Sequence, residues 1–236
     1  MQRNDPLTPL VDLPGVAQAA EQAVAAIARV HRRPSGLRQP EVISSESLLR
    51  GARASLGVQG KGLVRNPQPA DMEEGPLADA ISAYSVLAPE LASTTVRTFA
   101  RSPLQVLARI DVAAGGTGAP QQNSAQLQAL ARLIGRSEGV DFDRLLPVVI
   151  TAEIMANQFF GDNSLLVACV AGRVAAVHTG FDPRGFAIPE LYLHRNTQRL
   201  EEGIAKYAQY PAELLVVLLE AWEYGAQEAD GIARSL

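Results

Sequence analysis

The sequence predicts an all-α fold, a helical bundle around one buried central helix. Apolar residues recur at spacings of three and four through most of the chain, which is the period of an α-helix. Prolines and glycines lie where these runs begin and end. Residues 165–179 are apolar on nearly every face, as expected of a helix enclosed by others. No alternating run predicts a sheet, although residues 62–64 leave room for one short β-hairpin.

In the N-terminal part, the pattern predicts helices over 16–30 and 41–54, separated by Pro34-Ser35-Gly36. The glycine-containing stretch 57–69 is expected to be a loop. Residues 1–40 therefore form an N-terminal helix and linker, and residues 41–236 form the main helical domain, within what we expect to be a single globular unit.

The middle of the chain predicts three helices. The first covers 77–91, with Pro89 in its last turns. The second covers 104–113 and begins after Ser102-Pro103, a cap residue followed by proline. The glycine-rich segment 115–123 reads as a flexible loop. Ser124 is expected to cap the third helix, 125–134, which Gly135 ends in a left-handed conformation.

The C-terminal part carries the most regular patterns. They predict a helix over 145–159 with Pro147 in its first turn, the central helix 165–179 stopped by Gly180, and an extended stretch over 181–193. Asn196 should cap a helix that reaches residue 208, and Pro211 should open the last helix.

Composition and charge limit the classes of function. The 236 residues are 47% hydrophobic, enough for a real core, and the net charge is −4. An acidic chain lacks the basic face that nucleic-acid binding requires, so no nucleic-acid partner is expected. The one tight basic cluster is interpreted as a solvated helix end; it comprises Arg29, His31, Arg32 and Arg33.

Cysteine and histidine usage predicts neither a disulfide nor a metal site. The single cysteine, Cys169, lies in an apolar run and is expected to be a buried thiol. The three histidines lack the spacing of zinc ligands. No apolar run reaches the ~20 residues that span a bilayer, and the first residues carry no apolar signal core. These features predict a soluble, cytoplasmic protein.

A polar break, Gly161-Asp162-Asn163-Ser164, separates two helices. Backbone N–H groups at the start of a helix favour anions and can cradle phosphate. The alternative is that Ser164 caps the helix and no ligand binds. Around this break, residues 151–173 (TAEIMANQFFGDNSLLVACVAGR) resemble the central helix-loop-helix of the Fic (Fido-domain) family, whose signature is HxFx[D/E]GNGRxxR, and most closely an actinobacterial Fic-like branch.

Residues 50–55, 180–185, 188–190 and 221–229 also resemble that branch. The likeness as a whole covers about two-thirds of the chain, at varying strength. The resemblance implies an all-α fold with a short β-hairpin flap and, in active members, transfer of a nucleotidyl group from ATP. It also implies that Asp162 matches the acidic residue that holds magnesium, and that Phe160 matches the core phenylalanine.

The departures from the signature predict loss of this chemistry. Gln158 stands at the position of the histidine that acts as general base, and a carboxamide does not titrate near neutral pH. Asn163, Ser164 and Leu165 replace Gly-Asn-Gly, and the side chain of Leu165 should obstruct the approach of a phosphate to the backbone. Leu166 and Cys169 replace the two phosphate-binding arginines. Arg173 follows one helical turn later, as an anion contact or as a structural salt bridge.

A second family feature is an inhibitory helix of the form [S/T]xxxE[G/N]. Ser55, Gln59 and Gly60 fit this frame with glutamine in place of glutamate. A neutral Gln59 suits a site without its arginine, because a buried unpaired glutamate is costly. We therefore expect residues 55–60 to lie against the break, with Gln59 close to Asp162, Ser164 or Cys169, although this stretch could equally be a plain loop.

The sequence therefore predicts a Fic-like pseudoenzyme, without cofactor, that acts in protein interaction or regulation. One alternative is an adenylyltransferase or phosphotransferase with an altered site, in which Asp162 holds magnesium and ATP is the substrate. Another is a helical scaffold with no ligand. A protein partner is expected under the first interpretation, and self-association stays open.

Overall fold

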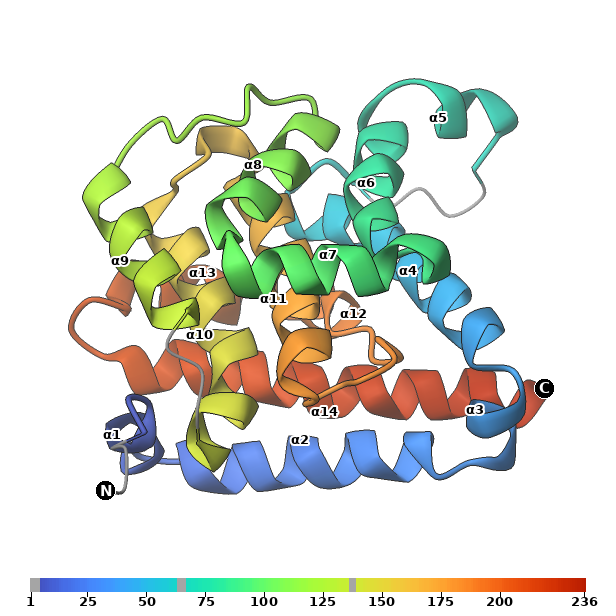
Figure 1. Ribbon diagram of the computed structural model, residues 1–236, viewed down its shortest axis with the longest axis horizontal. Helices are drawn as coiled ribbons and strands as arrows, with labels where there is room; N and C mark the ends of the chain where they lie inside the picture. The colour runs from blue at the N-terminus through green and yellow to red at the C-terminus, as the bar shows by residue number, and fades with distance from the viewer. Residues whose placement is uncertain (1–4, 63–66, 136–138) are drawn as a thin grey trace.

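The computed structural model is built of helices joined by turns, and it describes residues 5–62, 67–135 and 139–236 (Figure 1). No strand occurs in these ranges, so the all-α prediction is confirmed. Apart from Gly62, the hairpin expected at 62–64 lies outside the described residues. Over the same ranges, no helix is both long and apolar enough to cross a bilayer.

Fourteen α-helices and two 3-10 helices are described. In chain order they are α1 (Thr8–Val11), α2 (Val16–His31), α3 (Pro34–Arg38), α4 (Pro40–Val58), α5 (Pro69–Glu73), α6 (Pro76–Tyr84), η1 (Ser85–Leu87), α7 (Pro89–Arg101), α8 (Pro103–Ala113), α9 (Ser124–Ile134), α10 (Val140–Asn157), η2 (Gly161–Asn163), α11 (Ser164–Thr179), α12 (Glu190–Arg195), α13 (Thr197–Lys206) and α14 (Pro211–Ser235).

Helices α2 and α14 lie side by side and run in the same direction along one edge of the molecule (Figure 1, blue and red). Their facing stripes are rich in alanine, such as Ala20 and Ala221, which lets the backbones approach closely. Arg33, just after α2, donates to Asp230 Oδ1 at 2.6 Å. Helix α2 and the residue after it are thus packed onto α14.

The basic cluster at the end of α2 is not simply solvated, as the sequence suggested. His31 Nε2 lies 2.7 Å from Oδ1 of the buried Asp182, and its ring stacks on Phe186 with 4.5 Å between centroids. His31 and Arg33, two of the four residues of the basic cluster, thus each pair with an acidic residue from a distant part of the chain. The correction has a simple cause, because both acidic partners are more than 150 positions away in sequence.

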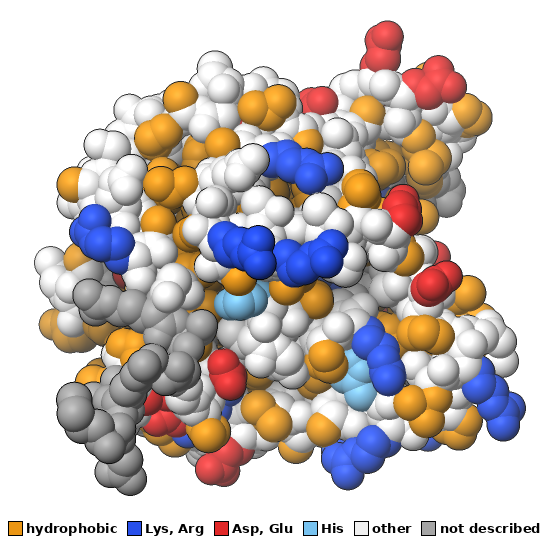
Figure 2. Space-filling view, viewed as in Figure 1, with side chains coloured by type: hydrophobic (Ala, Val, Ile, Leu, Met, Phe, Trp, Pro, Cys, Tyr) orange, Lys and Arg blue, Asp and Glu red, His pale blue; other side chains and the backbone are white. Residues whose placement is uncertain are grey.

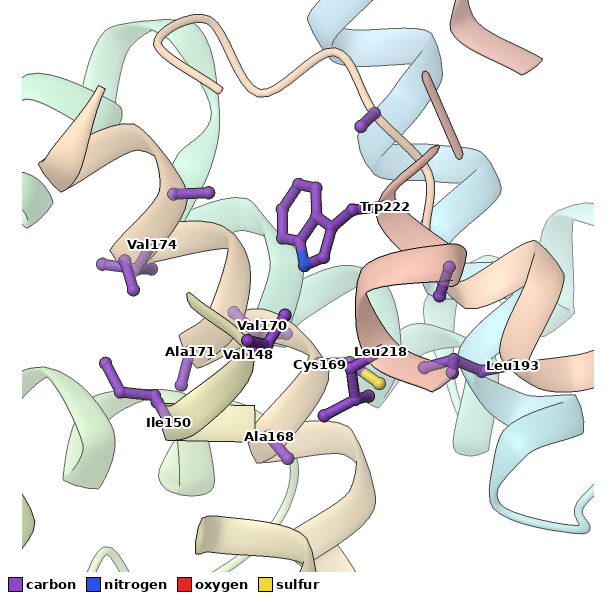
Figure 3. Packing of buried hydrophobic residues seen from close by; sticks show 14 of the residues in the cluster. Val148, Ile150, Ala168, Cys169, Val170, Ala171, Val174, Leu193, Leu218 and Trp222 are labelled. Atoms are coloured by element: carbon purple, nitrogen blue, oxygen red, sulfur yellow. The ribbon is translucent and has the colours of Figure 1, made fainter. Parts of the chain in front are cut away.

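The α10–α11 hairpin forms the centre of the molecule. Every residue of α11 from Leu166 to Ala176 is buried, which confirms the prediction of a central buried helix. Figure 3 shows Cys169 of α11 beside Leu218 of α14 and Leu193 of α12. Leu165, expected in this core, is only partly buried. Gly180 ends α11, as predicted, and it does so in the left-handed conformation with φ of 77°.

The middle segment differs most from its prediction. The helix expected over 77–91 ends at Tyr84, a 3-10 turn follows, and Pro89 begins the separate helix α7 instead of marking the end of the first. Proline fits the first turn of a helix as well as its last, so sequence alone gave the wrong choice. Helix α7 covers the middle of α11 (Figure 1).

Several other helix boundaries and one loop also differ from those that the sequence predicted. Helix α4 continues to Val58, and α10 begins at Val140, which places Pro147 inside it. Gly135 has φ of −72° and so is not left-handed. The stretch expected to be extended, 181–193, contains the start of α12. The starts of α8 and α14 at prolines agree with prediction.

Candidate functional site

The turn between α10 and α11 holds the residues that resemble the Fic signature. Helix α10 ends at Asn157, and Gln158 caps it in the left-handed conformation with φ of 48°. The side chain of Gln158 is exposed, whereas Phe160 is buried beneath the turn. Gly161 also has a positive φ, 54°, and the short helix η2 then leads into α11. The chain thus reverses within about one turn of helix.

The loop 115–123, hereafter the covering loop, lies against this turn. Gln121 donates its backbone N–H to the carbonyl of Phe159 at 2.7 Å. The side-chain amide of Gln122 donates to the carbonyls of Asn157 and Gln158 at 3.1 Å each. The last carbonyls of a helix have no partner within it, so these amides replace water at the end of α10. The covering loop is therefore a helix cap supplied from elsewhere in the chain.

Asp111, at the end of α8, joins the covering loop to the turn. The residue as a whole is 2% exposed. Oδ1 accepts from the Asn163 side-chain amide at 3.0 Å, and Oδ2 accepts from the Gly118 N–H at 2.8 Å. A buried carboxylate thus lies next to η2, and its charge opposes the approach of a second anion to the same place.

Most backbone N–H groups of the break have internal partners. Those of Gly161 and Asn163 donate to Gln158 and Phe160 carbonyls at 3.1 and 3.2 Å. Ser164 does not cap α11 with its side chain, as one alternative had it. Its Oγ instead accepts from the Phe160 N–H at 3.0 Å and so closes the turn. Groups engaged in this way are not presented to a phosphate.

The charged residues proposed for nucleotide binding are not brought together. Asp162 is exposed on η2, and it is the one acidic residue of the break. Across the described residues, no group of three or more His, Cys, Asp or Glu side chains is arranged to hold a metal ion. Asp162 is therefore not part of a cluster of side chains that could enclose a magnesium ion among the described residues.

Arg173 lies deep in the core instead. Its side chain is 1% exposed, and its guanidinium donates to the Ala187 carbonyl at 2.8 Å, the Gly185 carbonyl at 3.1 Å and the Ser47 hydroxyl. A carboxylate oxygen of Glu190 lies 3.7 Å away. Of the two roles considered for Arg173, this geometry corresponds to a structural salt bridge.

Tyr84 completes this buried cluster. It donates to Glu190 at 2.8 Å, and the Arg173 guanidinium lies 5.6 Å from the centre of its ring. Burial raises the pKa of Glu190, and the nearby positive charge of Arg173 opposes that rise. A Cβ added to Gly51 would lie 2.4 Å from Arg173 Nη1. The guanidinium therefore fits against α4 only because residue 51 has no side chain.

Leu166 and Cys169, which align with the two arginines of the Fic signature, are packed in the apolar core. Leu166 is 2% exposed, and burial raises the pKa of the Cys169 thiol well above its ordinary value. Cys169 is thus the inert buried thiol that the sequence predicted. Only about 10 Å³ of free space remains between Cys169, Glu190 and Trp222. A cavity of about 290 Å³ reaches the turn from the other side, at Phe160.

The segment that resembles the inhibitory helix forms the end of α4. Ser55 is buried within the helix, Gln59 is its C-cap and donates to the Ser55 carbonyl at 3.2 Å, and Gly60 has φ of 72°. The described contacts of this end lead to α12, since a Cβ on Gly57 would meet His194 Nδ1 at 2.1 Å. Proximity of Gln59 to the break stays a prediction, whereas the covering loop demonstrably lies on the turn.

Sequence reasoning missed the residues that hold these two regions together. In the sequence, Asp111 is one acidic residue within the predicted helix 104–113, with nothing to mark it as a buried hydrogen-bond acceptor. Glu190 lies in a segment, 188–190, that only weakly resembles the Fic-like branch. The polar run Gln121-Gln122-Asn123 does carry a signal, because side-chain amide N–H groups can donate to the unpaired carbonyls at the end of a helix. Nothing in the sequence says which helix they cap.

No family model matches the chain, and no curated protein is significantly similar to it.

Proposed function

We propose that this protein is a degenerate Fic-like domain that does not transfer nucleotidyl groups and acts through protein interaction. The proposal is carried by the Asp111 carboxylate, which accepts from Asn163 at 3.0 Å beside the break where a Fic enzyme holds phosphate. A buried negative charge at that point is incompatible with a triphosphate unless cations outweigh it. Arg173, the nearest arginine along α11, is committed to the core.

The side chains of the turn support the same conclusion. Gln158 offers a carboxamide where a general base would stand, so it cannot take a proton from a hydroxyl. Leu166 and Cys169 are buried, and neither carries a charge for a phosphate. A transferase with an altered site would need Asp162 to hold magnesium and a base from another element.

Nucleotide binding separates these functions. We expect no saturable rise in the melting temperature with millimolar ATP and magnesium, because a ligand at a hundred times its Kd would stabilise the fold by about 2.7 kcal/mol. Asp162→Ala is the matched control, since a true metal-dependent shift would disappear in it. We also expect no labelled product from radiolabelled ATP with the wild type or with Gln59→Gly. A shift that depends on Asp162, or labelled product, would replace this proposal with the altered transferase.

A further inference from the structure

A cavity of about 190 Å³ lies beside the last turns of α11, at the opposite end of that helix from the turn 158–164. Val177 of α11 borders it together with the starts of α4 and α7 and the loop 183–185. Figure 2 shows this side of the molecule, where a recess below α7 has basic and acidic side chains at its margins. The cavity is too small for a nucleotide, because pockets for drug-sized ligands measure about 300 to 1,000 Å³.

The cavity is lined by one positive and one negative side chain that do not pair with each other. They are Arg184 and Glu41, and both are exposed. Neither forms an ion pair within the described part of the chain. The cavity of about 670 Å³ at the start of α14 differs in this respect, because the arginine in its lining, Arg199, is paired with Glu220 at 2.8 Å. Two unpaired charges of opposite sign along one small cavity suit a ligand that carries both charges.

Arg184 is also held in place by uncharged groups. Exposed arginines without an ion pair among the described residues occur elsewhere, as at Arg132, so the missing acid alone does not distinguish Arg184. Its Nη1 donates to the Gly36 carbonyl at 3.2 Å and to the His31 carbonyl at 3.5 Å. The guanidinium carbon lies 6.0 Å from the centre of the Phe186 ring. These contacts orient the guanidinium without neutralising it, which leaves its charge for a carboxylate.

The rest of the cavity wall is mainly apolar. Its aliphatic side chains are those of Leu48, Leu87, Ala92 and Val177, and Ser44 is an uncharged polar member. A short aliphatic group placed against this wall would leave water, which is favourable. The wall and the two charged residues therefore match the three parts of an aliphatic amino acid, which are its carboxylate, its ammonium group and its side chain.

We infer that this cavity binds a free α-amino acid with an aliphatic side chain, with the carboxylate on Arg184 and the ammonium group on Glu41. The planar guanidinium can meet a carboxylate with two parallel hydrogen bonds. A simple anion such as phosphate would lie beside the Glu41 carboxylate, and a simple cation would lie beside Arg184, so a zwitterion suits the site better than either. The inference goes beyond the proposed function and uses no residue of the α10–α11 turn.

The test is isothermal titration calorimetry of the full chain with L-leucine, which should bind saturably. Isocaproate is leucine without its ammonium group, and it should bind about tenfold more weakly because one charge-assisted hydrogen bond is lost. Serine keeps both charges but lacks the aliphatic group, so it should bind several-fold more weakly than leucine.

Two variants locate the site. Arg184→Gln and Glu41→Gln should each bind leucine about tenfold more weakly than the wild type. The matched control for Arg184 is Arg32→Gln, because Arg32 is exposed and also donates to a carbonyl, that of Ala28, at 3.0 Å. For Glu41 it is Glu90→Gln, because Glu90 is likewise an exposed acid in the first turn of a helix. Neither control residue lines the cavity, so both controls should bind leucine as the wild type does.

Three results would overturn the inference. They are the absence of saturable leucine binding to the wild type, wild-type affinity for leucine in Glu41→Gln, and tighter binding of inorganic phosphate than of leucine. Glu41→Gln decides the matter even if Arg184→Gln loosens the loop 183–185 and melts at a lower temperature. The nucleotide melting experiment uses another ligand and another part of the molecule, so failure of this site and failure of the proposed function are distinguishable.

Discussion

Helix α11 carries two polar regions that are stabilised in different ways. At its start, the turn with Asp162 is partly exposed, and it is held by hydrogen bonds from the covering loop and by the bond from Asn163 to Asp111. Three turns later, Arg173 is enclosed with Glu190 and Tyr84. The sequence of the turn suggests a ligand site, but its polar groups bond mainly to one another and to the covering loop. Arg173, whose role the sequence left open, connects α11 with α4, α12 and α6. The comparison teaches that burial, more than residue type, decides how much a polar group matters to this fold.

The largest expected effect concerns the packing between these two regions. Leu166→Arg should destabilise the protein by about 4 kcal/mol or more, because it places an unpaired charge at a fully packed position. Leu165→Arg is the matched control; its side chain is only partly buried, so the loss should be much smaller. Chemical denaturation measures both. Equal, small losses would mean that position 166 faces an open cleft.

Arg173→Met tests the buried cluster itself. It should cost about 3 to 5 kcal/mol, because Glu190 would keep its burial without a nearby cation and two carbonyls would lose their donor. Arg195→Met is an unusually close control. Arg195 also lies 3.7 Å from a glutamate, Glu228, but its side chain is 57% exposed, so we expect a loss within about 1 kcal/mol. Similar losses in the two variants would contradict the role given to burial.

Asp111→Asn should have an intermediate effect on the turn. The new amide cannot accept from both Asn163 and Gly118 as the carboxylate does, so we expect a loss of about 2 kcal/mol. Hydrogen exchange at the Gly118 amide should also become faster. Asp162→Asn is the matched control, because Asp162 belongs to the same turn but is exposed. The stability of this variant should stay near that of the wild type. The reverse order would make Asp162, not Asp111, the residue that holds the turn.

The smallest effect concerns an ion pair at the molecular edge and depends on pH. Hydrogen bonding from Arg33 lowers the pKa of Asp230 below its ordinary value. A depressed folded pKa means that the stabilisation is present above the unfolded pKa of about 3.9 and is lost as the pH falls through the folded pKa. The melting temperature of Asp230→Asn should therefore lie below that of the wild type at pH 7, and the gap should close in acid. A gap that does not change with pH would show that the pair is not the cause.

The sequence by itself determined the helical class and the central position of α11. A run apolar on all faces has no stable place except inside a bundle, and Gly180 supplied the left-handed stop locally. Pro103 and Pro211 likewise mark the starts of α8 and α14, because proline fixes its own φ and lacks an N–H, which suits the first turn of a helix. These features rest on interactions within a few residues, which is the range that sequence patterns report.

Only the tertiary structure decided the contacts around the candidate site. Gln122 caps a helix that ends 35 residues later, and Arg173 meets the Ser47 hydroxyl across 126 positions. Pro89 could end one helix or begin the next, and the packing of α7 on α11 chose the second. In each case the local chemistry allows several partners of similar energy, and the arrangement of the bundle selects one by bringing it within hydrogen-bond distance.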